Sequence, residues 1–201
     1  MKAQDCLQLL RDVRDCTFAT VDENGFPQAR IIDVMVVENG SLYFCTSRGK
    51  DFHEQLVRTG RVAIAGLNAS WQTVRLSGPV RRVADQKAWI DRIFAENPSM
   101  NNVYPGDSRY ILDAFCIDSG QMEFFDLGQE PIYRERVPFG DEPARERGFV
   151  ITEDCTACGT CAEGCPQHCI EEGDIYRIQP EHCLHCGHCF EECPFEAIER
   201  L

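Results

Sequence analysis

Nine cysteines between residues 155 and 193 are the residues whose type and spacing point most directly to chemistry. Eight of them form two copies of the pattern C-x2-C-x2-C-x3-C-P, and Cys183 of the second copy follows Cys155 of the first by 28 residues. Three thiolates at this spacing come from one turning loop and can bind three iron atoms of a single cubane. The repeat therefore predicts iron–sulfur binding and one-electron transfer.

The fourth cysteine of each copy lies too far along the chain to complete its own cluster, and at this spacing it ligates the cluster of the other copy. The predicted ligands are Cys155, Cys158, Cys161 and Cys193 for the first [4Fe–4S] cluster, and Cys183, Cys186, Cys189 and Cys165 for the second. Zinc sites use CxxC pairs with a longer spacer, and haem attachment needs CxxCH, which the repeat lacks. In these features residues 151–201 resemble the bacterial two-cluster ferredoxins.

One cysteine and four histidines of this segment stand outside the repeat. Cys169 matches Ala197 of the second copy, so we expect a small packed side chain there rather than a ligand. The histidines are His168, His182, His185 and His188. Because no repeat cysteine is missing, we expect these imidazoles to face solvent or to tune a cluster through hydrogen bonds.

A second group of residues, suited to binding an anion, lies between a predicted strand and a predicted helix. It comprises Ser47, Arg48, Gly49 and Lys50. Free N–H groups at a helix N-terminus favour an anion, Gly49 allows a close backbone approach, and Lys50 adds a positive charge. The hydroxyl groups of Thr46 and Ser47 can donate hydrogen bonds. The alternative is a solvated turn with exposed basic side chains.

These residues must be positioned by short strands with few helices. Helices are expected over residues 3–14, 51–58 and 84–97, and strands over 16–21, 28–37, 41–46, 61–67, 71–83, 109–118 and 121–127. Asn-Gly pairs at 24–25 and 39–40 indicate tight hairpin turns. Six or seven antiparallel strands favour a barrel over an open parallel sheet, so the predicted fold is mainly β with a small C-terminal α+β domain.

This order of elements resembles the pyridoxamine 5′-phosphate oxidase-like flavoproteins, the FMN-binding split barrels. The segments that carry the resemblance are 17–34 (TFATVDENGFPQARIIDV), 42–56 (LYFCTSRGKDFHEQL), 61–66 (RVAIAG) and 122–127 (MEFFDL). The resemblance covers residues 3–130 and implies a split β-barrel that binds FMN at a homodimer interface.

The resemblance also implies roles for individual residues. Arg30 and Lys50 match the positions that hold the FMN phosphate. The backbone of Ile31, Ile32 and Asp33 would lie beside the flavin ring, with Cys45, Thr46 and Ser47 on the neighbouring strand and with Trp71, Gln72 and Arg75 contributed by the partner chain. The C-terminal residues that hold pyridoxal substrates in the vitamin-processing members are replaced here, so vitamin B6 oxidation is not expected.

Several side chains of this region have more than one interpretation. Cys45 is expected as a packed strand residue, with a reactive thiol as the alternative. Trp71 suits either a lid over the site or packing, whereas Trp89 suits the core. Asp33 could contact the flavin or a substrate, or face solvent. No side chain stands out as a catalytic acid, so catalytic residues are unassigned.

The charge is distributed unevenly along the chain. Of the net charge of −13 carried by 201 residues, residues 151–201 hold two basic and eleven acidic side chains, or 2 − 11 = −9. We expect a barrel domain over 1–133, an exposed charged linker over 134–148 and a ferredoxin domain over 149–201. Acidity argues against nucleic acid as a partner, and the absence of a long apolar run or a signal sequence leads us to expect a cytoplasmic protein with no membrane contact.

Together these features predict an oxidoreductase that moves electrons between two [4Fe–4S] clusters and FMN to act on a small-molecule substrate. Its acidic surface favours a redox partner protein with a basic patch. One alternative is an electron-transfer shuttle without its own substrate. Another is a barrel that binds a different ligand, such as haem or a deazaflavin.

Overall fold

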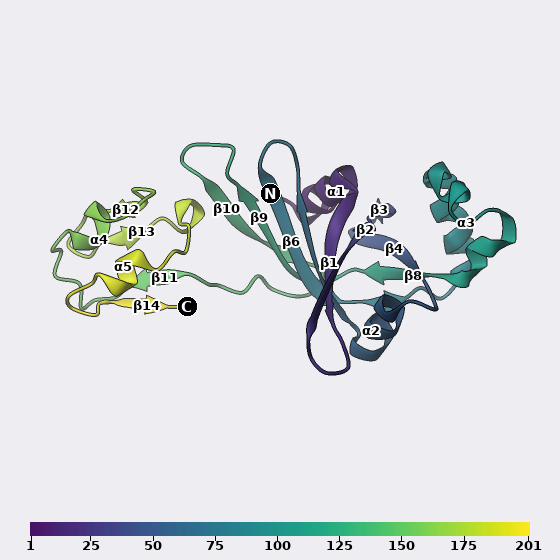
Figure 1. The fold of residues 1–201 in the computed structure, drawn as a ribbon. Helices are drawn as coiled ribbons and strands as arrows, with labels where there is room; N and C mark the ends of the chain where they lie inside the picture. The colour runs from purple at the N-terminus through teal and green to yellow at the C-terminus, as the bar shows by residue number, and fades with distance from the viewer. The chain divides into compact units, whose positions relative to one another are not determined.

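Two β-sheets build the N-terminal part of the computed structural model, which describes residues 1–201 (Figure 1). The six-stranded sheet has the order β10-β9-β6-β5-β1-β2, made of β1 (Asp15–Val21), β2 (Pro27–Asp33), β5 (Arg61–Leu67), β6 (Gln72–Pro79), β9 (Gly120–Asp126) and β10 (Tyr133–Phe139). The four-stranded sheet has the order β3-β4-β8-β7, made of β3 (Val36–Glu38), β4 (Ser41–Ser47), β7 (Arg81–Arg82) and β8 (Leu112–Ile117). The predicted mainly β fold is confirmed.

Aromatic side chains join the two sheets. The ring centroid of Phe18 in β1 lies 4.8 Å from that of Phe44 in β4, and Phe44 stacks on Phe115 of β8 at 5.6 Å. Phe52 of α2 (Asp51–Thr59) lies 5.9 Å from Phe44. Phe18, Phe44 and Phe115 are fully buried, so the core forms where β1 faces β4 and β8.

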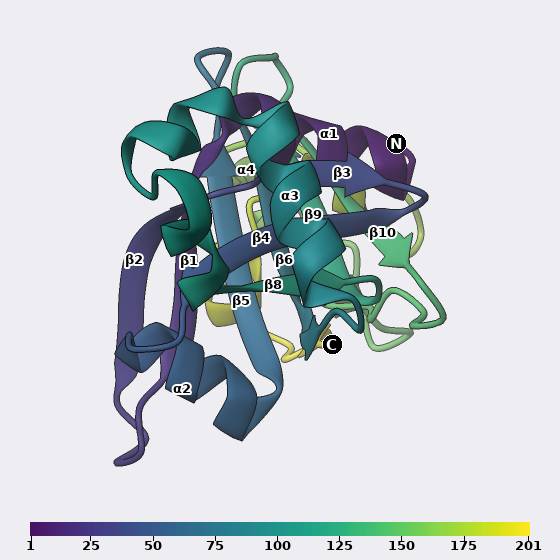
Figure 2. The same ribbon diagram turned by 90° about the vertical axis from the view of Figure 1, so that its right-hand side faces the viewer.

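Three helices cover these sheets, close to their predicted bounds. α1 (Ala3–Val13) buries Cys6, Leu7 and Leu10. α2 ends at Gly60, whose left-handed backbone (φ 61°) closes the helix as expected. α3 (Gln86–Glu96) lies across β4 and β8 (Figure 2), and two 3₁₀ segments follow it, η1 (Pro98–Asn102) and η2 (Gly106–Ile111). Trp89 stacks on Tyr43 at 3.9 Å and is half-buried rather than part of the central core.

Two predicted strands are each divided in the structure. Residues 28–37 form β2 and β3, because the chain passes from one sheet to the other at Val34 and Met35. There Val34 N–H donates to the Arg14 carbonyl and Met35 N–H to that of Tyr43. Residues 71–83 likewise form β6 and β7, with Val80 N–H donating to Gly60. Hydrophobicity alone does not reveal the crossing within 28–37, since both halves of that segment are apolar.

The chain divides into two units. The first comprises residues 1–69, 73–124 and 137–144, and the second comprises 70–72, 125–136 and 145–201. The elements of the C-terminal segment are β11 (Phe149–Ile151), α4 (Thr160–Glu163), β12 (Ile170–Glu171), β13 (Arg177–Ile178), η3 (Pro180–His182), α5 (His188–Glu191) and β14 (Ile198–Arg200). The first part of the predicted linker, residues 134–139, is not a linker in the structure, because it belongs to β10.

No helix of the chain has the length and apolar character needed to span a membrane.

Gly120 gives a test of the packing between β6 and the start of β9. A Cβ at Gly120 would lie 2.4 Å from the Ser77 carbonyl oxygen, and its φ of +145° disfavours any side chain. We expect Gly120→Ala to lower the free energy of unfolding by about 2–4 kcal/mol in urea titrations followed by tryptophan fluorescence.

The matched control is Gly49→Ala, because no atom lies within 4 Å of a Cβ built there. Its free energy of unfolding should stay within about 0.5 kcal/mol of wild type. Equal unfolding midpoints for Gly120→Ala and wild type would contradict the close contact.

Candidate functional site

The loop between β4 and α2 presents an uncapped helix N-terminus. No side chain caps α2, and Lys50, its N-cap residue, has an extended backbone (φ −95°, ψ 142°). The loop is closed by Lys50 N–H donating to the Ser47 carbonyl at 3.1 Å. Arg48, Gly49 and Lys50 are exposed. Uncapped N–H groups together with an adjacent lysine form a site suited to a phosphate.

Arg30 lies against the same helix from β2. Its guanidinium donates to Thr20 Oγ1 at 2.7 Å and to Gln55 Oε1 at 2.9 Å, and it lies 4.6 Å from the centre of the Phe52 ring. Partial burial lowers the pKa of Arg30, and the Asp51 carboxylate acts against that shift. The structure therefore brings Arg30 and Lys50, far apart in the sequence, to the first two turns of α2.

A buried carboxylate on β8 organises the basic side chains around this loop. Asp113, 2% exposed, receives Arg48 Nη1 at 3.3 Å, His53 Nε2 at 2.7 Å and Arg82 Nη2 at 3.0 Å. Burial opposes ionisation of Asp113, but hydrogen bonds and charge from these three partners hold its pKa below the ordinary value. Asp113 thus fixes the loop, α2 and β7 to one point.

Thr46 supplies an unused hydroxyl next to this carboxylate. It pairs directly with Asp113 across the β4–β8 ladder and is 2% exposed. Its Oγ1 is buried and has no hydrogen-bond partner within the chain. Buried hydroxyl groups are nearly always bonded. The orphan hydroxyl at the end of β4 therefore fits a bound ligand that completes the site.

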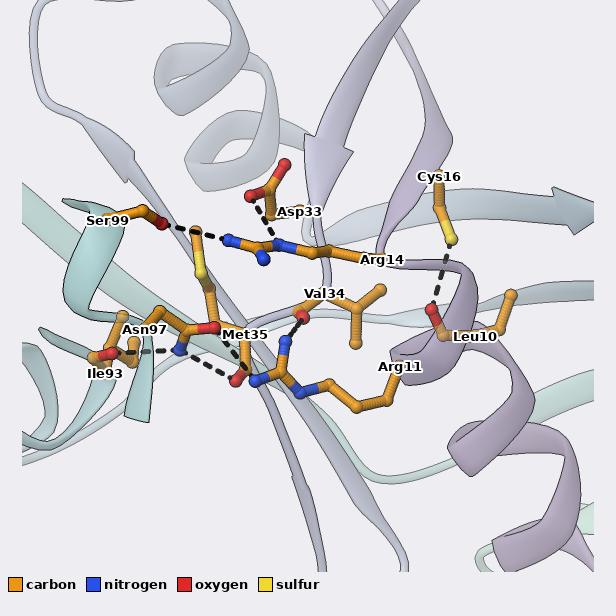
Figure 3. Close-up of polar contacts among 10 residues, drawn as sticks. All are labelled: Leu10, Arg11, Arg14, Cys16, Asp33, Val34, Met35, Ile93, Asn97 and Ser99. Atoms are coloured by element: carbon orange, nitrogen blue, oxygen red, sulfur yellow. Dashed lines mark hydrogen bonds and ion pairs between the residues drawn. The ribbon is translucent and has the colours of Figure 1, made fainter. Parts of the chain in front are cut away.

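Asp33 lies in a polar network at the end of β2 (Figure 3). Arg14 donates to the Asp33 carboxylate at 3.2 Å and to Ser99 Oγ at 3.1 Å. Burial raises the pKa of Asp33, and the cross-strand Asp15 carboxylate raises it further, while Arg14 acts against both. To the three interpretations given above the structure adds a fourth, an ion pair with Arg14, the residue that follows α1.

Two neighbouring residues complete the same network. Arg11 donates to the Val34 carbonyl at 2.6 Å and to Asn97 Oδ1 at 2.8 Å. Asn97 in turn donates to the Met35 carbonyl at 3.0 Å. The crossing between the sheets is thereby fixed by α1 and by the end of α3 (Figure 3).

The remaining predicted residues of these strands have different exposures. Ile31 is 60% exposed and Ile32 is half-buried. Cys45 is buried in a cluster with Met35 and Ala114. Burial, with the Asp33 charge as a smaller cause, raises the pKa of the Cys45 thiol to about 12, while Lys50 acts to lower it. Cys45 is thus a packed, protonated side chain that lies within electrostatic range of Asp33 and Lys50.

The three residues assigned to a partner chain lie at β6 or just before it. Trp71 is 61% exposed and has φ 64°, and Gln72 donates to Asp126 at 3.0 Å. Arg75 is exposed on the outer face of β6 and forms an ion pair with the buried Glu123.

The eight repeat cysteines line two separate cavities. The first is lined by Cys155, Cys158, Cys161 and Cys193, and the second by Cys165, Cys183, Cys186 and Cys189. Each cavity contains one complete predicted ligand set and no member of the other set. Cys169 also lines the second cavity, with its sulfur 3.6 Å from that of Cys165, and Ala197, its counterpart in the repeat, lines the first. Both cavities therefore fit a thiolate-bound cluster.

The backbone repeats along with the cysteines. Left-handed φ angles occur at the equivalent pairs Ala157 and His185 (55° and 56°) and Gly159 and Gly187 (85° and 84°). In both loops a backbone N–H points at the first cysteine, from Ala157 to Cys155 at 3.5 Å and from His185 to Cys183 at 3.3 Å. Such N–H···S bonds are a means of stabilising cluster thiolates.

Comparisons with known proteins agree with this geometry. The family model for pyridoxamine 5′-phosphate oxidase matches residues 3–105, just over half of the chain. The chain belongs to the pyridoxamine 5′-phosphate oxidase family. A second model, for a 4Fe–4S dicluster domain, matches residues 154–197. Both resemblances found in the sequence are confirmed, an FMN-binding type of split barrel followed by a ferredoxin domain.

Relatives match either part. A pyridoxine/pyridoxamine 5′-phosphate oxidase of Legionella pneumophila (strain Lens) is 26% identical over 157 residues, which is 73% of this chain and 67% of that enzyme. A ferredoxin of Butyribacterium methylotrophicum is 53% identical over 30 residues, 15% of this chain and 54% of that protein.

Solved structures share the fold. A NimC/NimA family protein from Clostridium acetobutylicum has a TM-score of 0.57 at 21% identity, covering 67% of this chain and 92% of that one. A protein from Clostridium acetobutylicum related to general stress protein 26 of B. subtilis has a TM-score of 0.53 at 13% identity, covering 66% and 95%. At such identities the similarity shows the fold alone.

Sequence reasoning missed the residues that hold the loop in place. Asp113, His53 and Arg82 come from three elements, and Gln55 supports Arg30 from a fourth position. The available signal was the single acidic residue in the otherwise apolar strand LDAFCI. A buried carboxylate needs partners, but the sequence does not say which cations reach it.

Removing the Asp113 charge tests this arrangement. We expect Asp113→Asn to lower the free energy of unfolding at pH 7 by about 1–3 kcal/mol, because Arg48 and Arg82 lose their ion pairs and His53 loses its carboxylate partner. The pKa of Asp113 is lowered from its ordinary value of 3.8. The stability that its ion pairs contribute is therefore fully present above pH 3.8 and is lost as the pH falls through the lowered pKa. The difference between wild type and variant should therefore persist from pH 7 to about pH 4.

Asp118→Asn is the control, because Asp118 pairs with Arg81 at 2.6 Å on the exposed surface. Its effect on urea unfolding should stay below about 1 kcal/mol. An Asp113→Asn variant as stable as Asp118→Asn would rule out an organising role for this carboxylate.

Proposed function

We propose that this chain is an FMN- and iron–sulfur-dependent oxidoreductase that moves electrons between two [4Fe–4S] clusters and FMN, and that it acts on a small-molecule substrate. The observation that carries the proposal is the orphan Thr46 hydroxyl near an uncapped helix N-terminus that Arg48 and Lys50 precede, in a chain whose eight repeat cysteines line two cavities. Bound FMN supplies chemistry that accepts electrons singly or in pairs, which suits one-electron clusters on one side and a two-electron substrate on the other.

In this proposal the residues around α2 hold the phosphate of FMN. Lys50 and the N–H groups of the first turn bind it, Arg30 adds a second cation, and Thr46 and Ser47 donate hydrogen bonds. The backbone of residues 31–33 and the adjacent strand at Cys45 line the ring. Because Cys45 is buried and its thiol protonated, it takes part by packing and not as a nucleophile.

We further propose a homodimer, supported by the outer face of the six-stranded sheet. Two rows of side chains run across β2, β1 and β5 on this face. One row consists of Ile31, Thr17 and Ala65, and the other consists of Ala29, Ala19 and Ala63. These small, uncharged side chains are partly or largely exposed, although the chain carries a net charge of −13. An uncharged patch in so acidic a chain, bordered by Arg75 as the cross-strand neighbour of Ala65, suits contact with a second copy. Trp71, Gln72 and Arg75 would then complete the partner's site.

The C-terminal segment supplies the electron-transfer side of the proposal. Its charge of −9 over residues 151–201, from two basic and eleven acidic residues, suits a redox partner protein that presents a basic patch. Each proposed cluster has four thiolate ligands and donates or accepts one electron at a time.

Lys50→Ala tests the phosphate site. We expect at least a tenfold weaker affinity for FMN, about the loss of one charge-assisted hydrogen bond, in fluorescence titrations of the flavin-stripped protein. Iron content should not change. Lys87→Ala removes an exposed lysine of α3 that pairs with Asp91 at 3.7 Å, and it should bind FMN as wild type does. Full FMN occupancy in Lys50→Ala would overturn the phosphate assignment.

Paired cysteine variants test the interleaved ligand sets. Wild type should contain about eight iron atoms per chain, four in each cluster. Cys155→Ala with Cys193→Ala removes two ligands of one proposed cluster and should leave about four irons. Cys155→Ala with Cys165→Ala removes one ligand from each and should leave almost none. The opposite pattern in anaerobic iron analysis would show that each copy of the repeat holds its own cluster.

A further inference from the structure

The second unit contains a large cavity that the proposed clusters and FMN site do not use. Its volume is about 560 Å³, within the range of small-molecule sites. Side chains of residues 133–136 line one part of it, and residues from 146–151, 176–181, His185 and Leu201 line the rest. All of these residues belong to the second unit.

This cavity shares its walls with both cysteine-lined cavities. Ile151 and Tyr176 line it and also line the cavity of Cys155 and its set. Phe149 and Ile178 line it and also line the cavity of Cys183 and its set. A molecule in the large cavity would therefore be separated from each proposed cluster by a single layer of side chains.

The charges in the cavity differ from those of the surrounding acidic segment. Four arginines line it, together with three glutamates. The side chains of Arg147 and Arg177 are exposed and make no hydrogen bond or ion pair within the chain, whereas Arg134 contacts His185 Nδ1 at 2.7 Å. Unpaired, solvent-accessible guanidinium groups on the wall of a cavity in a strongly acidic segment favour an anionic ligand.

Aromatic side chains accompany these arginines. Tyr133, Phe149 and Tyr176 all line the cavity, and Tyr133 is oriented by donating its hydroxyl to Glu135 at 2.8 Å. Flat aromatic walls suit a planar ring system, which they can contact by stacking. The cavity thus combines space for a ring, cations for an acidic substituent, and two neighbouring cluster sites.

We propose that this cavity binds a planar aromatic anion of the quinone type, which exchanges electrons with the clusters at a site separate from that of FMN. The proposal rests on the clusters of the proposed function. The quinone takes one electron from each of the two reduced clusters and two protons from water to give the hydroquinone, and both clusters return to their oxidised state.

The test uses anthraquinone-2-sulfonate and the anaerobic holoprotein with both cofactors bound. Isothermal titration of the oxidised protein should show one site per chain. Arg147→Gln with Arg177→Gln should weaken binding at least tenfold, with iron and FMN content unchanged. Arg200→Gln is the control, because Arg200 is an exposed arginine of the same segment that does not line the cavity. Absence of binding to wild type, or equal binding by the double variant, would overturn the site.

Two further measurements separate this site from the proposed function. Lys50→Ala, stripped of FMN, should still bind the probe, and loss of binding there would place the probe in the barrel instead. Mixing the dithionite-reduced, FMN-free variant with the probe should abolish the electron paramagnetic resonance signal of reduced clusters within the mixing time. A bound probe that leaves this signal intact would refute the electron exchange. Metal analysis that finds zinc in place of iron would refute the proposed function, and binding of the probe could still be measured.

Discussion

The site at α2 depends on one buried carboxylate. An ionised Asp113 at 2% exposure is stable only because Arg48, His53 and Arg82 surround it, since an unpaired charge at such a position costs several kcal/mol. These partners come from the loop, the helix and a neighbouring strand, so satisfying one charge fixes three elements. Thr46 is the cross-strand neighbour of Asp113, and its hydroxyl is buried there without a hydrogen-bond partner. The cost of one charge inside the sheet is thus offset by its basic partners, which also fix the loop before α2.

The two parts of the chain meet different physical demands. In the barrel, the proposed recognition of a phosphate depends on a few polar groups on regular secondary structure, which hold one another in place before any ligand binds. In the C-terminal segment little apolar core is available, and the buried residues are largely cysteines and isoleucines. Small domains of this kind commonly rely on metal binding for stability. Loss of a proposed cluster should therefore affect folding there more than loss of the proposed FMN affects the barrel.

The sequence predicted best where the information is local. The cysteine sets follow from spacing alone, and each set lines one cavity in the structure. Helix bounds followed from apolar periodicity and from Gly60, whose left-handed backbone ends α2. The organising role of Asp113 could not be predicted, because its three partners lie 31 to 65 positions away in the chain and only the fold brings them together. For the same reason the sequence predicts one strand over 28–37 where the structure has two. The hydrogen bonds that hold Val34 and Met35 between them go to Arg14 and Tyr43, which local patterning does not reveal.

The crossing at Val34 and Met35 has a mechanical consequence. Arg11 and Asn97 bind its carbonyl groups, and Arg14 joins Asp33 to Ser99 at the start of η1. The strand end that carries Asp33 is therefore tied to the segment after α3, whose residues 101–103 and 105–108 are exposed. A displacement of that segment that keeps both Arg14 bonds would shift the carboxylate of Asp33. The surface after α3 and the end of β2 are therefore coupled through the side chain of one arginine.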